Sequence, residues 1–186
     1  MSVLKWIREK LRSYFFRVEV NKRRRVKTVM GLDESRMVGI IFDASESADY
    51  SQVVSLVSSL RESGKKVRGM GFVRQKQKPA FIFDQIHFSF CQARDFSWNL
   101  KLKSPALVEF TETEMDLLLD LSPSGLFSPK YLAAITNARY KVGNYHPDQV
   151  EIYDMMIQEK EPFDLKEFID HCLQYLKIIK KPVTHA

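Results

Sequence analysis

Short apolar runs alternate along most of the chain with segments whose apolar residues recur at helical spacing. The runs at residues 37–42, 66–73 and 116–121 are typical of strands buried in a parallel sheet. Apolar positions spaced by about 3.6 residues predict helices around residues 53–62, 129–138 and 164–179. Gly64 suits the left-handed C-terminal cap of the first of these helices, and Asp164 suits the N-cap of the last.

Weaker patterns fill the remaining positions. Residues 81–83 and 86–88 have short strand-like patterns, residues 95–100 predict an irregular aromatic loop folded back on the sheet, and Pro105 opens a short helix. Residues 139–143 and 151–157 predict two further strands. Because strands and helices alternate, we expect an α/β fold, a three-layer Rossmann-like sandwich with a mainly parallel sheet.

An amphipathic, basic helix precedes this domain. Its expected apolar stripe, which Trp6 and Phe16 interrupt, consists of Leu4, Ile7, Leu11, Tyr14, Phe15 and Val18. The only plausible boundary lies near residues 28–36, so we expect a basic helical arm and linker at residues 1–36 and the Rossmann-like domain at residues 37–186.

The positive charge belongs to the arm. The 186-residue chain has 45% hydrophobic and 28% charged residues, as globular domains do, and a net charge of +6. Residues 1–37 hold eleven Lys/Arg against four acids, whereas residues 38–186 hold eighteen against nineteen. Five cations cluster after the helix, and the expected fold has no need of them: Lys22, Arg23, Arg24, Arg25 and Lys27.

Three interpretations of the arm remain open. In the first, the apolar stripe packs on the domain. In the second, the stripe lies on an anionic membrane surface. In the third, the basic run neutralises the phosphates of RNA or of a ribonucleoprotein. The stripe can pack while the basic run binds elsewhere. The longest apolar runs have about six residues, short of the ~20 that a membrane span needs, so we expect a cytoplasmic protein that is peripheral at the inner membrane if its partner is lipid.

The search for familiar catalytic motifs is largely negative. The first strand is followed by an acidic turn without glycine, which is a poor cradle for a nucleotide pyrophosphate. The two cysteines, Cys91 and Cys172, form no CxxC, and with His87 and His171 they would make a zinc site only by coincidence. We therefore expect no cofactor and no metal.

Carboxylates at strand ends are the better candidates for chemistry. Asp43 closes the first strand and Asp120 lies near the end of the 116–121 run, at the edge where ligands bind in open α/β sheets. They would serve in acid–base catalysis or simply cap and pair locally, which we favour. Ser122, Asn137 and Asn144 would line the same rim, and Trp98 would pack on the domain or meet a partner.

Six sequence blocks resemble a known family: VGIIFDA at 38–44, GKKVRGMGFV at 64–73, FSWNLKLK at 96–103, MDLLLDLS at 115–122, YLAAITNARYKVG at 131–143 and YLKIIKK at 175–181. They resemble an uncharacterised family of small bacterial proteins, a domain of unknown function, so no activity is transferred. The strand at 115–121 and the short strand ending in Val-Gly are also similar to the N-terminal half of heptosyltransferases. That likeness implies a Rossmann-like fold more than a reaction, because the nucleotide-sugar site of those enzymes lies mainly in a second domain.

These observations favour a non-catalytic binding module that docks through its basic N-terminal arm to an anionic partner. The alternative is a small sugar- or nucleotide-related transferase or hydrolase that uses the carboxylates at the strand ends.

Overall fold

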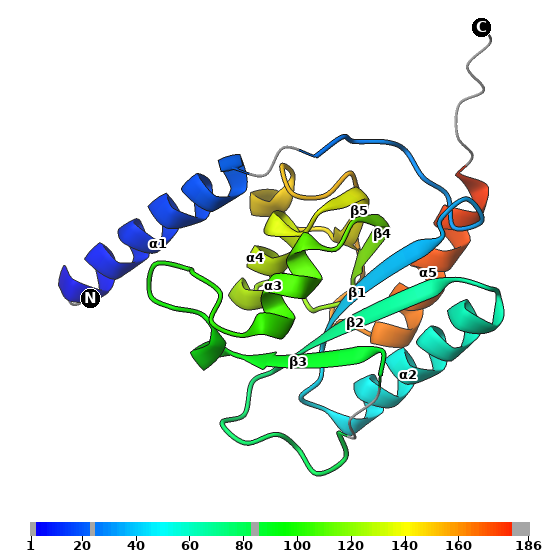
Figure 1. Ribbon diagram of the computed structural model, residues 1–186, viewed down its shortest axis with the longest axis horizontal. Coiled ribbons are helices and arrows are strands. Elements are labelled where there is room, and N and C mark those ends of the chain that lie inside the picture. Colours follow the sequence, from blue (N-terminus) through cyan, green and yellow to red (C-terminus); the bar gives the residue numbers. More distant parts are fainter. Residues whose placement is uncertain (1–2, 23–24, 83–85, 180–186) are drawn as a thin grey trace, which may run out of the picture.

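Six parallel strands form the centre of the molecule, and helices cover both faces of the sheet (Figure 1). The computed structural model describes residues 3–22, 25–82 and 86–179, and in the first helix it describes the side chains from Lys10 onward. The strands are β1 (Met37–Asp43), β2 (Lys66–Val73), β3 (Phe88–Gln92), β4 (Met115–Asp120), β5 (Ala138–Asn144) and β6 (Met155–Ile157). All neighbouring strands pair in parallel. The predicted Rossmann-like α/β fold is therefore confirmed.

The strand order creates one switch point. The sheet runs β3-β2-β1-β4-β5-β6, so the chain builds outward from β1 in one direction and from β4 in the other. Ile41 of β1 lies beside Asp120 of β4 in the register. In open α/β sheets a crevice forms outside the carboxyl ends of the two strands at such a point. Both candidate carboxylates, Asp43 and Asp120, end strands at this place.

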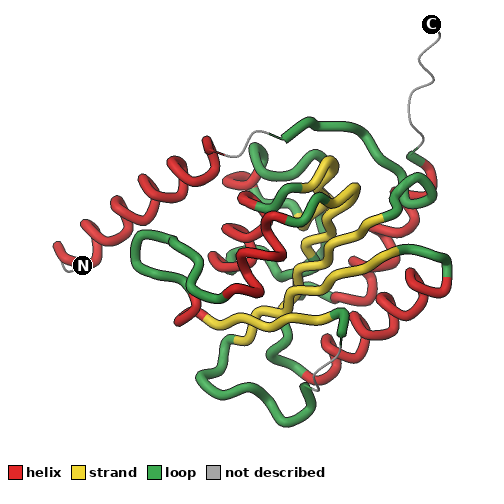
Figure 2. Tube along the Cα trace, in the orientation of Figure 1, coloured by secondary structure: helices red, strands yellow, loops and turns green. Residues whose placement is uncertain are grey.

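Alternating side chains of the strands divide the core into two layers, one on each side of the sheet. Figure 2 shows the helices that lie on either side of the strands. In β1, Ile40 and Phe42 face α2 (Ser47–Glu62) and α5 (Leu165–Ile178), which cover one side of the sheet. Ile41 faces α3 (Pro105–Glu112) and α4 (Phe127–Ile135) on the other side. Because both faces are buried, β1 is apolar along nearly its whole length.

Helix α1 (Val3–Lys22) lies outside these three layers and packs over α4. The chain then crosses the top of the domain in Figure 1 to reach β1. This segment is packed against the domain, since Met30 and Leu32 are buried and the Leu32 N–H donates to the Leu176 carbonyl at 2.9 Å. The stretch that we expected to be a linker thus contributes to the core.

Two local signals are confirmed. Gly64 follows α2 with φ +84°, and the hydrogen bonds from Gly64 N to Arg61 O and from Lys65 N to Leu60 O close a Schellman cap. Asp164 caps α5, where its carboxylate accepts from the Glu167 N–H at 3.0 Å.

Some element boundaries differ from the prediction. The third strand is Phe88–Gln92, not the two pieces at 81–83 and 86–88, because β3 follows its partner: Gly69 and Gly71 of β2 leave the space that the Phe88 and Phe90 rings fill. The last strand is only Met155–Ile157, and α4 spans Phe127–Ile135, beginning and ending earlier than expected. Two single turns of 3-10 helix, η1 (Ala93–Asp95) and η2 (Pro147–Gln149), lie in loops.

Candidate functional site

The basic run lies where α1 ends and the chain returns to the domain. Lys22 is the last residue of α1, and Arg25 and Lys27 lie on the segment that follows. The side chains of Lys22 and Lys27 are 60% and 63% exposed. Arg23 and Arg24 lie outside the described residues. The three described cations of the predicted binding run therefore come together at one place.

A cavity of about 570 Å³ opens at this junction. Its lining residues include four cations, Lys22, Arg25, Lys27 and Lys141, and one acid, Glu151. We call this hollow the junction cavity. Its excess of positive charge suits an anionic ligand group.

The cations of the junction cavity are partly neutralised by neighbouring acids. Lys22 Nζ lies 2.6 Å from Glu19 Oε1, one helical turn away, and Lys27 Nζ lies 3.5 Å from Asp154 Oδ1. An exposed ion pair such as Lys22–Glu19 contributes only about 0–1 kcal/mol, so an incoming phosphate can compete for the Lys22 ammonium. Asp154 is nearly buried and is held mainly by Arg25, so the 63% exposed Lys27, at the longer distance, can also turn its ammonium to a phosphate.

Arg25 has a structural role that the sequence analysis missed. Its guanidinium forms a two-pronged ion pair with Asp154, at 2.7 and 2.8 Å, and also donates to the Arg139 carbonyl at 3.1 Å. Both side chains of the pair are only 11% exposed. The expectation that the fold has no need of these five cations is thus wrong for Arg25, because it fastens the start of the linker to β5 and the loop before β6.

Lys141 also lines the junction cavity, and the sequence analysis did not single it out. It is 1% exposed, and its ammonium donates to the carbonyls of Ala133 and Ala134 at 2.6 and 3.1 Å. These carbonyls belong to the last turn of α4, where the helix dipole favours a positive charge. The sequence does hold a signal for this role, because Lys141 lies between Tyr140 and Val142 in a predicted strand, where a lysine is unusual.

Helix α1 packs through a face that only partly overlaps the predicted stripe, since Phe15 of that stripe packs on the domain together with Phe16 and Val20. Phe16, which we expected to interrupt the apolar stripe, contacts Phe127 and Tyr131 at ring-centroid distances of 6.1 and 5.9 Å. Leu11 and Tyr14, which we placed on the stripe, are 42% and 62% exposed. The stripe therefore does not turn wholly toward the domain, because the domain selects the face that fits the aromatic surface of α4.

Asp43 has a local structural role at the switch point. Its carboxylate accepts from the Ser45 N–H at 3.0 Å and lies 2.9 Å from Nε of Arg74. Asp43 is 5% exposed and is therefore not open to solvent. Asp43 thus pairs locally, as we favoured, but it does not cap α2, whose N-cap is Glu46.

Asp120 repeats the turn of Asp43 and has a different second partner. Its carboxylate accepts from the Ser122 N–H at 3.0 Å and from the Tyr153 hydroxyl at 2.6 Å. Burial raises the pKa of Asp120 although these hydrogen bonds act to lower it, and burial together with the Asp120 charge raises the pKa of Tyr153. Asp120 is therefore a buried acid at this edge of the sheet whose pKa is raised.

The space beside Asp120 is too small for a substrate. A cavity of about 10 Å³ is lined by Asp120, Ser122, Asn144 and Tyr153, among others, but not by Asp43. Such a volume holds about one water molecule. Asn137, which we expected on this rim, lies at the opposite edge of the sheet, because it precedes β5 and lines the junction cavity. The two carboxylates do not share an open cleft.

The remaining sequence candidates lie apart from one another. Cys91 and Cys172 are buried free thiols, and burial raises the pKa of Cys172 to about 12. Within residues 3–22, 25–82 and 86–179, no three His, Cys, Asp or Glu side chains are grouped as a metal ion requires. The Trp98 side chain is 74% exposed, although its ring meets Phe15 edge-on at 5.5 Å.

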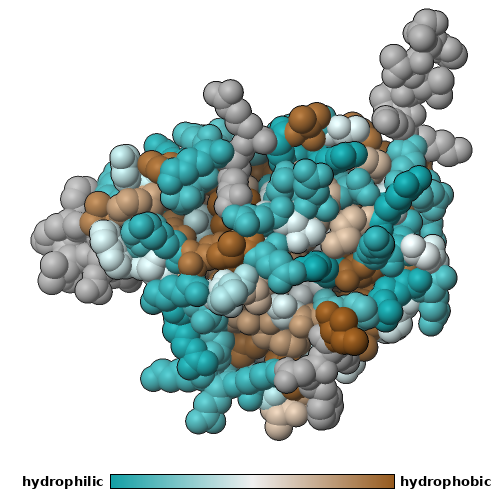
Figure 3. All heavy atoms as spheres, viewed as in Figure 1, coloured by the Kyte–Doolittle hydropathy of each residue, from teal (hydrophilic) through white to brown (hydrophobic). Residues whose placement is uncertain are grey.

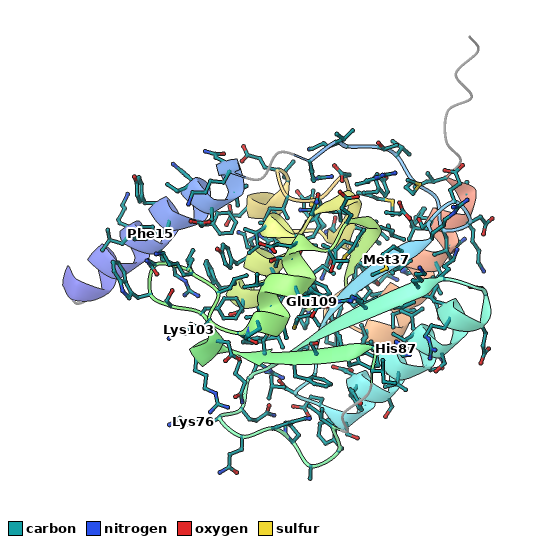
Figure 4. All side chains as sticks on the ribbon, in the orientation of Figure 1. Phe15, Met37, Lys76, His87, Lys103 and Glu109 are labelled. Carbon is teal, nitrogen blue, oxygen red and sulfur yellow. The ribbon has the colours of Figure 1, made fainter. Side chains whose placement is uncertain are left out.

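Another basic cavity was missed by the sequence analysis. It has a volume of about 660 Å³ and lies at the amino ends of β1, β2 and β3, where Met37, His87 and Glu109 surround it (Figure 4). Lys66 and Arg68 also line it, and Arg68 is paired with Glu109. Its lining cations, Arg61, Lys65, Lys66 and Arg68, lie within eight residues at the end of α2 and the start of β2, a short basic stretch that the sequence analysis did not single out.

Comparisons with known proteins show the family of this chain. Residues 8–179 match the model of a family described as a family of unknown function, DUF6913, as the sequence blocks indicated. No curated protein sequence matches. Among solved structures, E. coli heptosyltransferase WaaC with ADP is similar, with 15% identity and a TM-score of 0.48 over 81% of this chain and 50% of that chain. This chain thus spans about half the length of that enzyme.

Within the described residues, no helix combines the length and hydropathy that crossing a bilayer requires.

Proposed function

The chain belongs to DUF6913, a family of unknown function, and we propose that it is a non-catalytic binding module that docks to an anionic, phosphate-bearing partner through the junction at the end of its N-terminal arm. The observation that carries this proposal is the junction cavity, where four cations gather near three acids, Glu151, Glu19 and Asp154, and the ammonium groups of Lys22 and Lys27 are more than half exposed. Arg23 and Arg24 add two positive charges to the same short stretch of sequence.

The buried and the exposed cations of the junction cavity have different roles. Arg25 and Lys141 are held by carbonyls and by Asp154, so they fix the walls of the cavity. Lys22 and Lys27 are more than half exposed, and each holds its acid, Glu19 or Asp154, through one ammonium contact. The exposed pair is therefore the part of the site that can exchange its contacts for a phosphate group.

The alternative function, a transferase or hydrolase that uses Asp43 and Asp120, has weaker support. Each carboxylate is occupied by its own turn and its own partner, and the cavity at Asp120 has room for about one water molecule. General acid–base catalysis needs the group within hydrogen-bond reach of a substrate. The junction cavity, of about 570 Å³, has room for a ligand group, whereas the cavity of about 10 Å³ beside Asp120 has none for a substrate.

Replacing the exposed cations tests the proposal. The variant Lys22→Gln/Lys27→Gln should bind total RNA and anionic lipid vesicles about thirtyfold more weakly than wild type, because two cations near an anionic surface contribute about 2 kcal/mol. For RNA, the slope of log affinity against log salt should fall by nearly 2. Affinity is measured by filter binding for RNA and by co-sedimentation for vesicles.

A variant with the same loss of charge serves as the control. Lys66→Gln/Lys76→Gln removes two exposed cations, one at the basic cavity below the sheet and one on the loop after β2, away from α1 (Figure 4). It should retain binding within about twofold, apart from the small effect of net charge. Equal losses in both variants, or no binding of either probe by wild type, would refute docking at the junction.

A further inference from the structure

Three large apolar side chains are exposed together where α1 lies beside the loop that follows η1. They are Leu11, Tyr14 and Trp98, with exposed fractions of 42%, 62% and 74%. Leu11 and Trp98 line one groove of about 710 Å³, and Tyr14 joins it through Phe15, whose ring lies 5.5 Å from the rings of both Tyr14 and Trp98. We call these three residues the apolar platform. Single exposed apolar residues are ordinary, whereas a contiguous patch marks an interaction site.

The turn that carries Trp98 is held in place by hydrogen bonds. Ser97 N donates to the Lys101 carbonyl and Leu100 N donates to the Ser97 carbonyl, both at 2.9 Å. Leu100 adopts φ +63°, a conformation that is costly for a residue with a Cβ atom. Burial of its side chain and a hydrogen bond from the Tyr131 hydroxyl to its carbonyl, at 2.8 Å, maintain it. The fold thus accepts a strained turn whose outer residue is an exposed tryptophan.

Positive charges border the platform. Lys10 and Arg17 are exposed on α1, and Lys101 and Lys103 are exposed on the loop. Phe15 lies on the side of α1 that faces this loop, and Lys103 lies where the loop returns to α3 (Figure 4). Hydrophobic and hydrophilic side chains consequently alternate over α1 at the left of Figure 3.

We infer that the anionic partner is a membrane surface, and that the apolar platform enters its headgroup region while the surrounding cations contact lipid phosphates. Tryptophan and tyrosine prefer this depth because one end of the ring is apolar and the other polar. Among the described side chains that line the groove, Arg12 alone is charged, so the groove is largely apolar and lacks the row of cations that would follow an RNA phosphate backbone. This chemistry favours lipid over RNA.

The junction cavity and the platform share one side of α1. Leu11 and Lys22 are eleven residues apart, which at 100° per residue leaves an angle of about 20° between them around the helix axis. They are separated by about 16 Å along that axis. A flat anionic surface can therefore meet both. The inference rests on the proposed function, since it names the partner for the same arm.

Vesicles separate this inference from the proposed function. The probes are vesicles of about one third phosphatidylglycerol and two thirds phosphatidylcholine, vesicles of phosphatidylcholine alone, and total RNA. Wild type should co-sediment with the anionic vesicles and not with vesicles of phosphatidylcholine alone. Tyr14→Ser/Trp98→Ser should lower that partitioning about tenfold, because interfacial binding follows the apolar area buried, and should leave the effect of the junction cations unchanged.

The matched control is Tyr175→Ser/Ile178→Ser, which removes two apolar residues, 50% and 69% exposed, from α5 on the other side of the sheet. It should partition as wild type does. A Trp6→Phe variant leaves Trp98 as the only tryptophan, and its emission should shift to the blue on anionic vesicles.

Each result decides between the two proposals. An unchanged Trp98 emission, or wild-type partitioning of Tyr14→Ser/Trp98→Ser, would overturn the membrane inference. Junction-dependent binding of RNA without binding of vesicles would overturn it as well and would leave the proposed function standing. Absence of binding to every probe would remove both.

Discussion

Replacing Arg25 with glutamine should weaken the attachment of the arm and destabilise the whole domain. The change leaves Asp154 as a nearly buried carboxylate without its two-pronged partner. Breaking a buried pair from one side costs about 3–5 kcal/mol. Two contacts of Asp154 remain, the Lys141 N–H at 2.9 Å and the Lys27 ammonium at 3.5 Å. Because these contacts partly compensate the carboxylate, we expect a loss somewhat below that range, about 2–3 kcal/mol in the free energy of unfolding.

Urea denaturation and thermal melting measure this loss. In a domain of this size each kcal/mol corresponds to about 2–4 °C in melting temperature, so Arg25→Gln should melt about 5–10 °C below wild type. Lys22→Gln is the matched control, because it removes the same charge three positions earlier from an exposed pair with Glu19. It should change the free energy of unfolding by less than about 0.5 kcal/mol.

A double-mutant cycle identifies the partner. Asp154→Asn alone and combined with Arg25→Gln should give a coupling energy of about 1–3 kcal/mol, since the residues are in direct contact. If Arg25→Gln changed stability no more than Lys22→Gln does, or if the coupling energy were near zero, the ion pair would not fasten the arm and this reasoning would be refuted.

Three other perturbations test separate parts of the structure. Burial raises the pKa of Asp120, so the folded protein keeps a proton that the unfolded chain releases above about pH 4. The stability of wild type should therefore fall relative to that of Asp120→Asn as the pH rises from about 4. Urea denaturation from about pH 4 to 8 measures this, and parallel profiles of the two proteins would contradict it. Phe16→Ala should lower the free energy of unfolding, measured by urea denaturation, by about 2–3 kcal/mol, and Tyr14→Ala should lower it by less than about 0.5 kcal/mol. Equal losses would mean that α1 does not pack through the face that carries Phe16. Asp164→Ala should lower the free energy of unfolding by about 1 kcal/mol through the lost cap of α5, measured by thermal melting; no change would mean that the cap contributes nothing.

Much of the domain can be read from local patterns. The run at residues 37–42 is apolar throughout because both faces of β1 are covered, and Gly64 and Asp164 mark helix ends through their own backbone and side-chain chemistry. The charge of the arm is likewise a property of composition. For such features the cause lies within a few residues of the effect.

The candidate site could be predicted only in outline. The run at residues 22–27 was visible, but not its division into a buried anchor at Arg25 and exposed cations at Lys22 and Lys27, because the division depends on Asp154, which is 129 positions from Arg25. Lys141 joins the cavity because the last turn of α4 ends above its strand. Trp98 is presented outward because Leu100 and Tyr131 hold its turn.

The sequence by itself determined the alternation of strands and helices, the helix ends marked by Gly64 and Asp164, and the place of the positive charge. The tertiary structure decided which face of α1 packs, that β3 begins at Phe88 where the glycines of β2 admit its rings, and that Asp43 and Asp120 are held in separate turns. The physical reason is range. Backbone preference and hydrophobic period act between neighbours in the chain, whereas burial and ion pairing depend on partners that only the folded chain brings together.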